Sequence, residues 1–403
     1  MKNFIIPLRR LKFLSSLLFS IILVSCSENP SITGYNLLNP VETLTVNQFD
    51  STRDSVFIYH KQLTQADNLG ATRRILVGQY GDLKAYSLIR FTIGLSSELK
   101  DAVKKSNVNI VSARVKLNPV YKFGDTTSNS YGIEIKEIFS YFNEYTFTLD
   151  SLKSGKYQIA TENIVTRNID DDTLYYSELN TNNVLNWFKA IATDSSNKLQ
   201  GILLSPTNYT NYIKGFASSN AYYVGDPIVL EVVAQYNSKT DSLKFFVDAD
   251  LFVVETSSPV VTNDAQIVLQ SGLKTKSLIF FDVSKIPKSS VVNSSILRLY
   301  PDTVSSKFGT SYHDSLFVQF VVDSSKISID SVVNFVLIKT EHGYYEGQIN
   351  YFMQKWIDND ANRGLLISTR DPDGGVDKFV FYGPQSAIFE KRPQLIINYS
   401  YRK

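Results

Sequence analysis

The residue types that most often carry catalysis or metal binding are scarce in this chain. Its only cysteine is Cys26, and its three histidines, at positions 60, 313 and 342, have neither the HExxH nor the His-x-His spacing of a zinc site. No Gly-x-Ser-x-Gly elbow, phosphate-binding loop or dinucleotide fingerprint occurs. A pair of carboxylates for glycoside cleavage is defined by its separation in space, so the sequence leaves such a pair open. We therefore expect a protein that is not an enzyme and has no cofactor.

One acidic segment has the composition of a cation-binding loop. Asp371, Asp373 and Asp377 surround a Gly-Gly turn, and calcium prefers carboxylate oxygens of this kind. The segment lacks the Asp-x-Asp-x-Asp-Gly spacing and the distal glutamate of an EF-hand loop. Pro-Asp and Asp-Gly dipeptides also favour a hairpin turn. We expect a solvated turn here, with a structural calcium site at the three aspartates as the alternative.

The segment 207–212 combines aromatic rings with amides. It reads Thr-Asn-Tyr-Thr-Asn-Tyr, so Asn208, Tyr209, Asn211 and Tyr212 fall within five residues. Flat rings stack on the faces of sugars, and amides bind sugar hydroxyl groups. The pattern predicts a carbohydrate-binding loop. The alternative is that these rings cover strand ends or pack across strands.

The first 26 residues form a segment of their own. Four basic residues lie within the first twelve positions, and Phe13–Val24 is mostly apolar but too short to span a ~30 Å hydrocarbon core as a helix. The sequence Leu23-Val24-Ser25-Cys26 that follows resembles the lipobox of bacterial lipoproteins. The alternative is an ordinary signal peptide with a chance cysteine.

The lipobox resemblance implies a processed and acylated protein. Residues 1–25 are then a signal peptide, and Cys26 carries several acyl chains, which anchor a protein durably where one chain is marginal. Ser27 follows the cysteine in place of aspartate, which by analogy with the family favours the outer membrane, at its periplasmic face or at the cell surface. Residues 26–45 contain Pro30, Gly34 and Pro40 without a clear period, so they are expected to be a lipidated tether.

Composition narrows the fold class and the partners. Lysine and arginine total 41 against 39 acidic residues, so the net charge of +2 gives no nucleic-acid footprint. Aromatic residues make up 13% of the chain, which favours β structure. A chain of 403 residues is long enough for two or three domains. No later segment approaches 18 consecutive apolar residues, so no second membrane segment is expected.

Segments of the first half recur in the second half in the same order. The segments 83–91 and 273–281 agree at six of nine positions, and Lys122-Phe-Gly124 recurs as Lys307-Phe-Gly309. Gly201-Ile-Leu-Leu-Ser205 recurs as Gly364-Leu-Leu-Ile-Ser368. The spacing is the size of a domain, far above the ~20–50 residues of solenoid repeats. It predicts a tandem duplication, with domains at 46–240 and 241–403.

Periodicity predicts mainly strands, with one helix in each half. Strict alternation at 113–117 and at 133–135 indicates strands with one buried face. Val184, Trp187 and Phe188 have helical spacing, and the segment 349–357 repeats this pattern around Trp356. Both tryptophans are therefore expected in the core. The fold class we expect is all-β, with two tandem jelly-roll-like β-sandwiches that each carry one short amphipathic helix.

The repeat resembles the disaggregatase-related (DNRLRE-type) family of β-sandwich modules. The resemblance rests on Ser87-Leu-Ile-Arg-Phe91, Phe142-Asn-Glu-Tyr-Thr-Phe147, the segment from Trp356 to Leu366, and the terminal strand Arg392–Tyr399. Some members of the family are classed as carbohydrate-binding, so the resemblance implies a sandwich fold and carbohydrate as a ligand class.

Three functions follow, in order of preference. The first is a non-catalytic lipoprotein, anchored in the outer membrane, that binds polysaccharide through its β-sandwich modules. The second is a structural or protein-interaction component of the cell envelope, in which edge strands contact an envelope protein. The third is a polysaccharide-processing enzyme.

Overall fold

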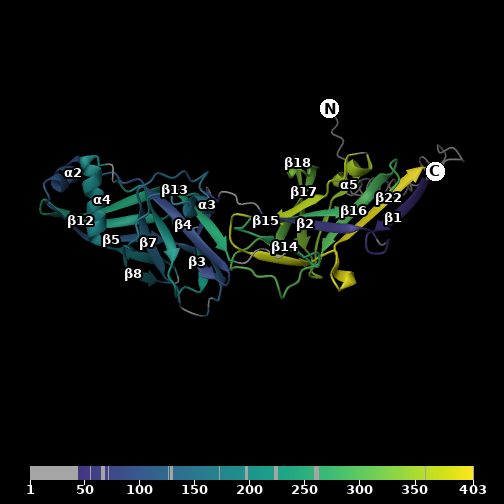
Figure 1. The fold of residues 1–403 in the computed structure, drawn as a ribbon, viewed down its shortest axis with the longest axis horizontal. Helices are drawn as coiled ribbons and strands as arrows, with labels where there is room; N and C mark the ends of the chain where they lie inside the picture. Colours follow the sequence, from purple (N-terminus) through teal and green to yellow (C-terminus); the bar gives the residue numbers. More distant parts are fainter. Residues whose placement is uncertain are drawn as a thin grey trace, which may run out of the picture.

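A computed structural model gives the fold of the chain (Figure 1). It describes residues 44–402 apart from short gaps at 55, 65–68, 71, 126, 128–129, 172, 196–197, 222–225, 258–262 and 359. The signal peptide, Cys26 and the tether up to residue 43 therefore lie outside the described residues, whereas residues 44 and 45, expected as the end of the tether, already belong to a strand. Within the part that is described, no helix has the length and apolar character needed to cross a membrane.

The strands form two eleven-stranded antiparallel sheets, one in each of two units. The strands of the first unit are β3 (Arg74–Tyr80), β4 (Leu83–Phe91), β5 (Val108–Leu117), β6 (Pro119–Gly124), β7 (Ile133–Ile138), β8 (Val165–Asp170), β9 (Tyr175–Leu179), β10 (Gly201–Pro206), β11 (Tyr212–Ala217), β12 (Val229–Tyr236) and β13 (Lys239–Thr256). Those of the second unit are β1 (Leu44–Asp50), β2 (Ile58–Thr64), β14 (Gln266–Gln270), β15 (Thr275–Phe281), β16 (Val291–Leu299), β17 (Ser315–Asp323), β18 (Ser328–Lys339), β19 (Tyr345–Gln348), β20 (Leu365–Thr369), β21 (Lys378–Tyr382) and β22 (Gln394–Arg402). The predicted all-β, sandwich-like class is confirmed.

Strand β13 joins the two layers of the first unit. Its first half, Lys239–Phe246, pairs with β12, and the rest pairs with β4. The register shifts between Val247 and Ala249, and a bulge of this kind bends a strand so that it passes from one layer to the other. One layer thus runs β8-β9-β5-β12-β13, and the other contains β13, β4, β3, β11 and β6. The apolar core of the first unit lies between them.

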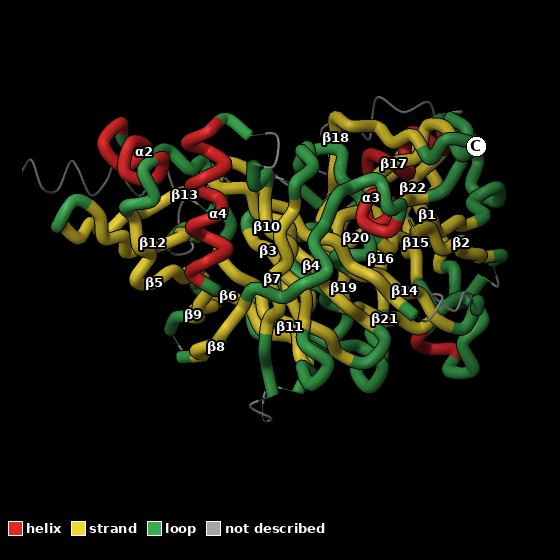
Figure 2. The backbone as a smooth tube through the Cα atoms, turned by 60° about the vertical axis from the view of Figure 1, so that its left-hand side comes forward, coloured by secondary structure: helices red, strands yellow, loops and turns green. Residues whose placement is uncertain are grey.

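Short helices pack against both sandwiches. In the first unit these are α2 (Ser97–Lys104), α3 (Leu149–Lys153) and α4 (Thr181–Thr193), and in the second they are α5 (Asn350–Ile357) and the 3₁₀ turn η2 (Phe389–Lys391). Helices α2 and α4 pack together at the end of the first unit that points away from the second (Figures 1 and 2). The two predicted amphipathic helices are confirmed as α4 and α5, and Trp187 and Trp356 are buried as expected. The N-cap of α4 is Asn180.

The two units repeat one set of strand pairings. Strand β4 pairs with β3, β10 and β13, and β15 likewise pairs with β14, β20 and β2. In the same way β12 pairs with β13 and β5, while β22 pairs with β1 and β16. The matched sequence segments occupy matching places, since Leu88 faces Leu203 in one unit and Leu278 faces Leu366 in the other. Strands β1 and β2 together thus take the place that β13 holds in the first unit.

The two units of the structure therefore do not follow the predicted domain ranges, 46–240 and 241–403. The N-terminal strands at 44–64 belong to the second unit, and β13, at 239–256, belongs to the first. The first unit, residues 74–256, is inserted between two parts of the second unit, residues 44–64 and 266–402. The physical reason is that strand pairing, not sequence order, closes each sandwich, and the second unit completes its sheet with strands from the start of the chain.

A network of hydrogen bonds, partly buried, joins the two units. The hydroxyl group of Tyr121, on β6, donates a hydrogen bond to Asp377 Oδ1 over 3.1 Å. The backbone N–H of Gly309 donates to the same oxygen over 2.7 Å. Arg74 donates to the carbonyl oxygens of Ser311 and Gly374. Because the chain crosses between the units twice and these contacts bridge them, we expect the two sandwiches to move together.

Candidate functional site

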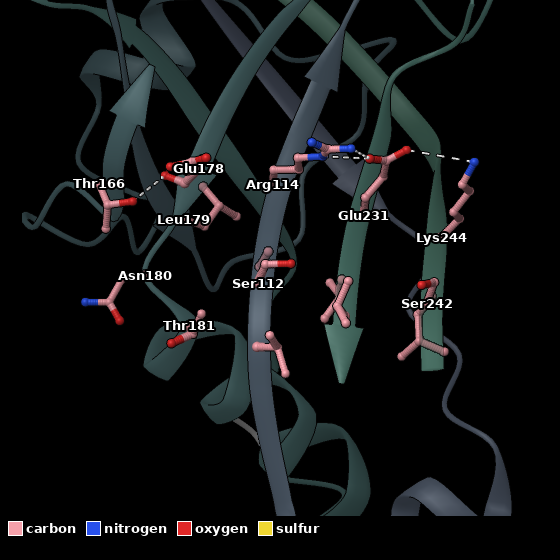
Figure 3. Close-up of a pocket in the computed structure, with 15 residues that line it drawn as sticks. Ser112, Arg114, Thr166, Glu178, Leu179, Asn180, Thr181, Glu231, Ser242 and Lys244 are labelled. Carbon is pink, nitrogen blue, oxygen red and sulfur yellow. Dashed lines mark hydrogen bonds and ion pairs between the residues drawn. The ribbon is translucent and has the colours of Figure 1, made fainter. Parts of the chain in front are cut away.

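A shallow groove crosses the outer face of the first unit (Figure 3). It has a volume of about 810 Å³ and runs over β9, β5, β12 and the first half of β13. Antiparallel sheets often keep one face on the core and one in water, which makes side chains alternate between the two faces. On β5, for example, Ala113 and Val115 are buried while Ser112 and Arg114 face outward. The groove is thus the solvated face of the layer.

Charged side chains form a row of alternating sign across this face. The strand register places Arg167 opposite Glu178, Glu178 opposite Arg114, Arg114 opposite Glu231 and Glu231 opposite Lys244. These five residues, the charge ladder, come from β8, β9, β5, β12 and β13. Directly paired residues on neighbouring strands lie close enough for their side chains to interact. The ladder is therefore a product of register.

Two ion pairs fix the centre of the ladder. Arg114 contacts Glu231 at 2.8 Å, and Lys244 approaches the other oxygen of Glu231 to 3.8 Å. Glu231 thus lies between two cations, as Figure 3 shows. The Arg114 guanidinium also lies over the ring of Tyr176, 4.5 Å from its centroid, which holds it flat against the sheet.

Neutral polar groups and rings border the ladder. On one side Ser112 and Ser242 lie opposite Val233 on their neighbouring strands, and Thr166, Asn180 and Thr181 complete that end of the groove. On the other side the next row contains Tyr176 and, on β13, Phe246, whose ring is exposed. The groove therefore offers hydrogen-bond donors and acceptors, and aromatic rings lie beside it in the next row of the sheet.

The structure separates the two tyrosines of the segment 207–212. Tyr209 is 56% exposed, whereas Tyr212 is 5% exposed and packs against Tyr131 in the core. Thr210 Oγ1 accepts a hydrogen bond from the backbone N–H of Gly132 over 3.0 Å, which ties the segment to the residue that precedes β7. The two rings consequently do not form one exposed platform.

The two asparagines of this segment lie near its surface. Asn208 is exposed and Asn211 is half-buried. Asn211 lines a hollow of about 530 Å³ with Gln79, Tyr80 and Asp125. This hollow and the groove share no lining residue.

The acidic segment 371–377 lies at the junction of the units. Its three carboxylates contact different residues and do not converge on one point. Asp373 pairs with Lys274 at 3.1 Å, Asp377 accepts from Tyr121 and Gly309, and Asp371 lines a small cavity beside Asp377. Burial raises the pKa of Asp377 to about 6. Within the described ranges, no group of three or more His, Cys, Asp or Glu side chains is placed to hold a metal ion.

A second set of exposed rings lies on the second unit. Phe57 and Tyr59 are both exposed, with ring centroids 6.0 Å apart, and Tyr59 lies 5.4 Å from Phe280 across the β2–β15 pair. The three rings form a short strip, which we call the aromatic strip. It gives the second unit an aromatic surface of its own, separate from the groove.

Comparisons with known proteins give no family. No protein-family model and no curated protein match the chain. Among solved structures, the C-terminal domain of the AgI/II polypeptide BspA from Streptococcus agalactiae is similar at 10% identity over 85% of this chain and 90% of that one, with a TM-score of 0.17. The C-terminal domain of the antigen I/II-family protein AspA from Streptococcus pyogenes is similar at 10% identity over 86% and 96%, with a TM-score of 0.16. We draw no conclusion from likenesses of this size.

The groove is the feature that sequence reasoning missed. The five residues of the charge ladder are spread over about 130 positions, from Arg114 to Lys244, so no local motif marks them. The alternation at 113–117 did identify a solvated strand face. Only the order of strands in the sheet places Glu178 and Glu231 on the two strands that flank Arg114 of β5.

Proposed function

We propose that this chain is a non-catalytic lipoprotein that binds polysaccharide in the groove of its first unit. The observation that carries the proposal is the charge ladder, set among hydroxyl and amide groups and bordered by Tyr176 and Phe246. Each sugar hydroxyl both donates and accepts, so a surface with guanidinium, carboxylate and hydroxyl groups side by side matches it at every position. The exposed ring of Phe246 supplies a face on which a sugar ring can stack.

The shape of the groove suits a chain better than a small compact molecule. It is open along its length and crosses four strands, which at ~4.7–4.9 Å each makes it roughly 14 Å wide from first to last strand. A ligand that lies across the strands meets the members of the ladder one after another. Several weak contacts along one polymer then add up to useful binding.

The proposed anchor rests on the sequence. Residues 1–25 act as the signal peptide and Cys26 carries the lipid, which holds the two sandwiches at the outer membrane through the tether. This location would place the groove where envelope or external polysaccharide is found. Labelling with a radioactive fatty acid, with Cys26→Ala as the control that loses the label, tests it.

A second candidate is interaction with an envelope protein, and the aromatic strip favours it. Exposed aromatic groups that lie together are enriched at protein interfaces. Phe57, Tyr59 and Phe280 lie on the second unit and not in the groove, so variants can separate the two functions.

Removing the central pair of the ladder is expected to abolish polysaccharide binding. In Arg114→Ala/Glu231→Ala, the loss of charged hydrogen bonds lowers affinity at least about tenfold. Folding stability changes by no more than about 1 kcal/mol, since both partners of a partly exposed pair leave together. Affinity electrophoresis of residues 27–403 through gels cast with polysaccharides measures the binding, and urea unfolding measures the stability.

The second unit provides a matched control. Arg298 and Glu346 form a cross-strand ion pair at 2.7 Å, and Arg298 lies over the ring of Tyr344 just as Arg114 lies over Tyr176. Arg298→Ala/Glu346→Ala is expected to retain full retardation. Retardation that survives in Arg114→Ala/Glu231→Ala but is lost in Phe57→Ala/Tyr59→Ala would move the site to the aromatic strip and overturn the assignment to the groove.

A further inference from the structure

The charged side chains that line the groove cancel one another. Four charged residues line it, the cations Arg114 and Lys244 and the anions Glu178 and Glu231. Glu231 is in contact with both cations. The lining as a whole therefore has no net charge and presents no pair of cations free of a neighbouring carboxylate.

Beyond the lining, the ladder adds one further cation, Arg167, which the strand register places opposite Glu178. Lys116, the next outward residue along β5 from Arg114, pairs with Asp226 at 3.1 Å. At the other end of the ladder, Glu178 stands between Arg114 and Arg167 in the strand register. A polyanion that entered the groove would meet the carboxylates of Glu178 and Glu231 at close range. Contact between like charges of this kind rejects a partner more strongly than a missing contact does.

We propose that the groove selects uncharged polysaccharides and rejects acidic ones. This inference rests on the proposed polysaccharide-binding function and adds the class of ligand. The ladder supplies the N–H groups of Arg114 and Lys244 and the oxygens of Glu178 and Glu231 in alternation. That order matches the hydroxyl groups of a neutral sugar chain, which need a donor and an acceptor in turn. No counterion is released when such a ligand binds, so the binding is insensitive to salt.

The test is affinity electrophoresis of residues 27–403 in gels that contain either a neutral polymer (glucan, mannan or galactan) or a polyuronate (alginate or pectate). We expect retardation by at least one neutral polymer and by neither polyuronate. The dissociation constant for the neutral polymer should change less than about twofold between 10 mM and 1 M NaCl, a range over which the Debye length falls from about 30 Å to about 3 Å.

A charge variant adds a gain of binding to the test. Glu178→Gln/Glu231→Gln keeps the shape of the groove but leaves Arg114 and Lys244 unopposed. It is expected to bind polyuronate at least about tenfold more tightly than the parent, and this gain should disappear at 1 M NaCl. Glu346→Gln, which removes the partner of Arg298 on the second unit, is the control and should gain nothing.

The outcomes separate this inference from the function on which it rests. Salt-sensitive retardation of the parent protein by polyuronate alone, lost in Arg114→Ala/Glu231→Ala, would overturn the preference for uncharged ligands and leave polysaccharide binding in place. Retardation by none of the polymers, together with no gain in Glu178→Gln/Glu231→Gln, would overturn both.

Discussion

Replacing Asp170 with alanine is expected to lower the free energy of unfolding by about 2–4 kcal/mol. Asp170, at the end of β8, forms an ion pair with Lys214 on β11. The Lys214 side chain is 2% exposed and lies among the rings of Tyr131, Tyr175 and Tyr212, with its ammonium 4.8 Å from the nearest centroid. Removing the carboxylate breaks the ion pair that Asp170 makes with this buried cation, and breaking a buried pair typically costs about 3–5 kcal/mol. Partial exposure of Asp170 reduces the expected loss.

The reverse substitution is expected to have a much smaller effect. Lys214→Met leaves Asp170, which is 34% exposed and can be hydrated. Methionine has nearly the length of the lysine stem and fills the space between the rings, and apolar replacement of a buried charge is often neutral. We expect a loss of no more than about 1 kcal/mol. The double variant Asp170→Ala/Lys214→Met should lie close to Lys214→Met, because both variants lack the buried cation.

Urea unfolding of the parent and the three variants at pH 7 measures this asymmetry. Equal losses in Asp170→Ala and Lys214→Met would contradict it, because the effect would then come from packing and not from the buried charge. The comparison of two single variants and the double variant isolates the coupling between the two side chains.

The substitution Asp377→Asn is expected to change how the free energy of unfolding depends on pH. Burial raises the pKa of Asp377 to about 6, from an ordinary value of 3.8. The native protein therefore holds this proton more tightly than the unfolded chain does. Its contribution to stability is fully present below pH 3.8 and is lost as the pH rises through 6. Since one pKa unit corresponds to about 1.4 kcal/mol, the contribution is on the order of 2–3 kcal/mol.

The measurement is the difference in unfolding free energy between Asp377→Asn and the parent, at pH 8, 6 and 4. The variant keeps an oxygen for Tyr121 and Gly309 without carrying a charge. Its advantage over the parent should be largest at pH 8 and fall by about 2–3 kcal/mol at pH 4. A difference that stays constant across this range would show that Asp377 does not titrate as the junction geometry implies.

Asp302 provides a control of opposite sign. Hydrogen bonds from Ser305 and Val304 lower its pKa, although burial acts in the other direction. The parent therefore loses the stability that Asp302 contributes as the pH falls. Relative to the parent, Asp302→Asn should gain stability on acidification, whereas Asp377→Asn should lose it.

Local sequence pattern correctly predicted several elements of this fold. The alternation at 113–117 and 133–135 corresponds to β5 and β7, and the helical spacing around Trp187 and Trp356 corresponds to α4 and α5. These features follow from which face of a strand or helix is buried, and neighbouring residues along the chain record that directly. The recurrence of segments in the two halves reflects the matching strand pairings for the same reason.

The same local reasoning failed where distant strands decide a residue's surroundings. Tyr209 and Tyr212 are alike in the sequence, yet one faces water and the other lies against Tyr131. The segment 371–377 has the composition of a solvated turn, yet Asp377 is buried against Tyr121, 256 positions away. Composition gives the chemistry of a side chain, but its neighbours come from strand order.

The sequence by itself determined the class of the fold, the recurrence of segments between its halves, the core tryptophans and the expectation of a lipid-modified Cys26. The tertiary structure decided that residues 44–64 complete the second unit, that the acidic segment joins the units, and that Arg114, Glu178 and Glu231 form one row. The physical reason is that periodicity is set by each element's own buried face, whereas sites form from residues on separate strands. Which strands become neighbours depends on how whole sheets close.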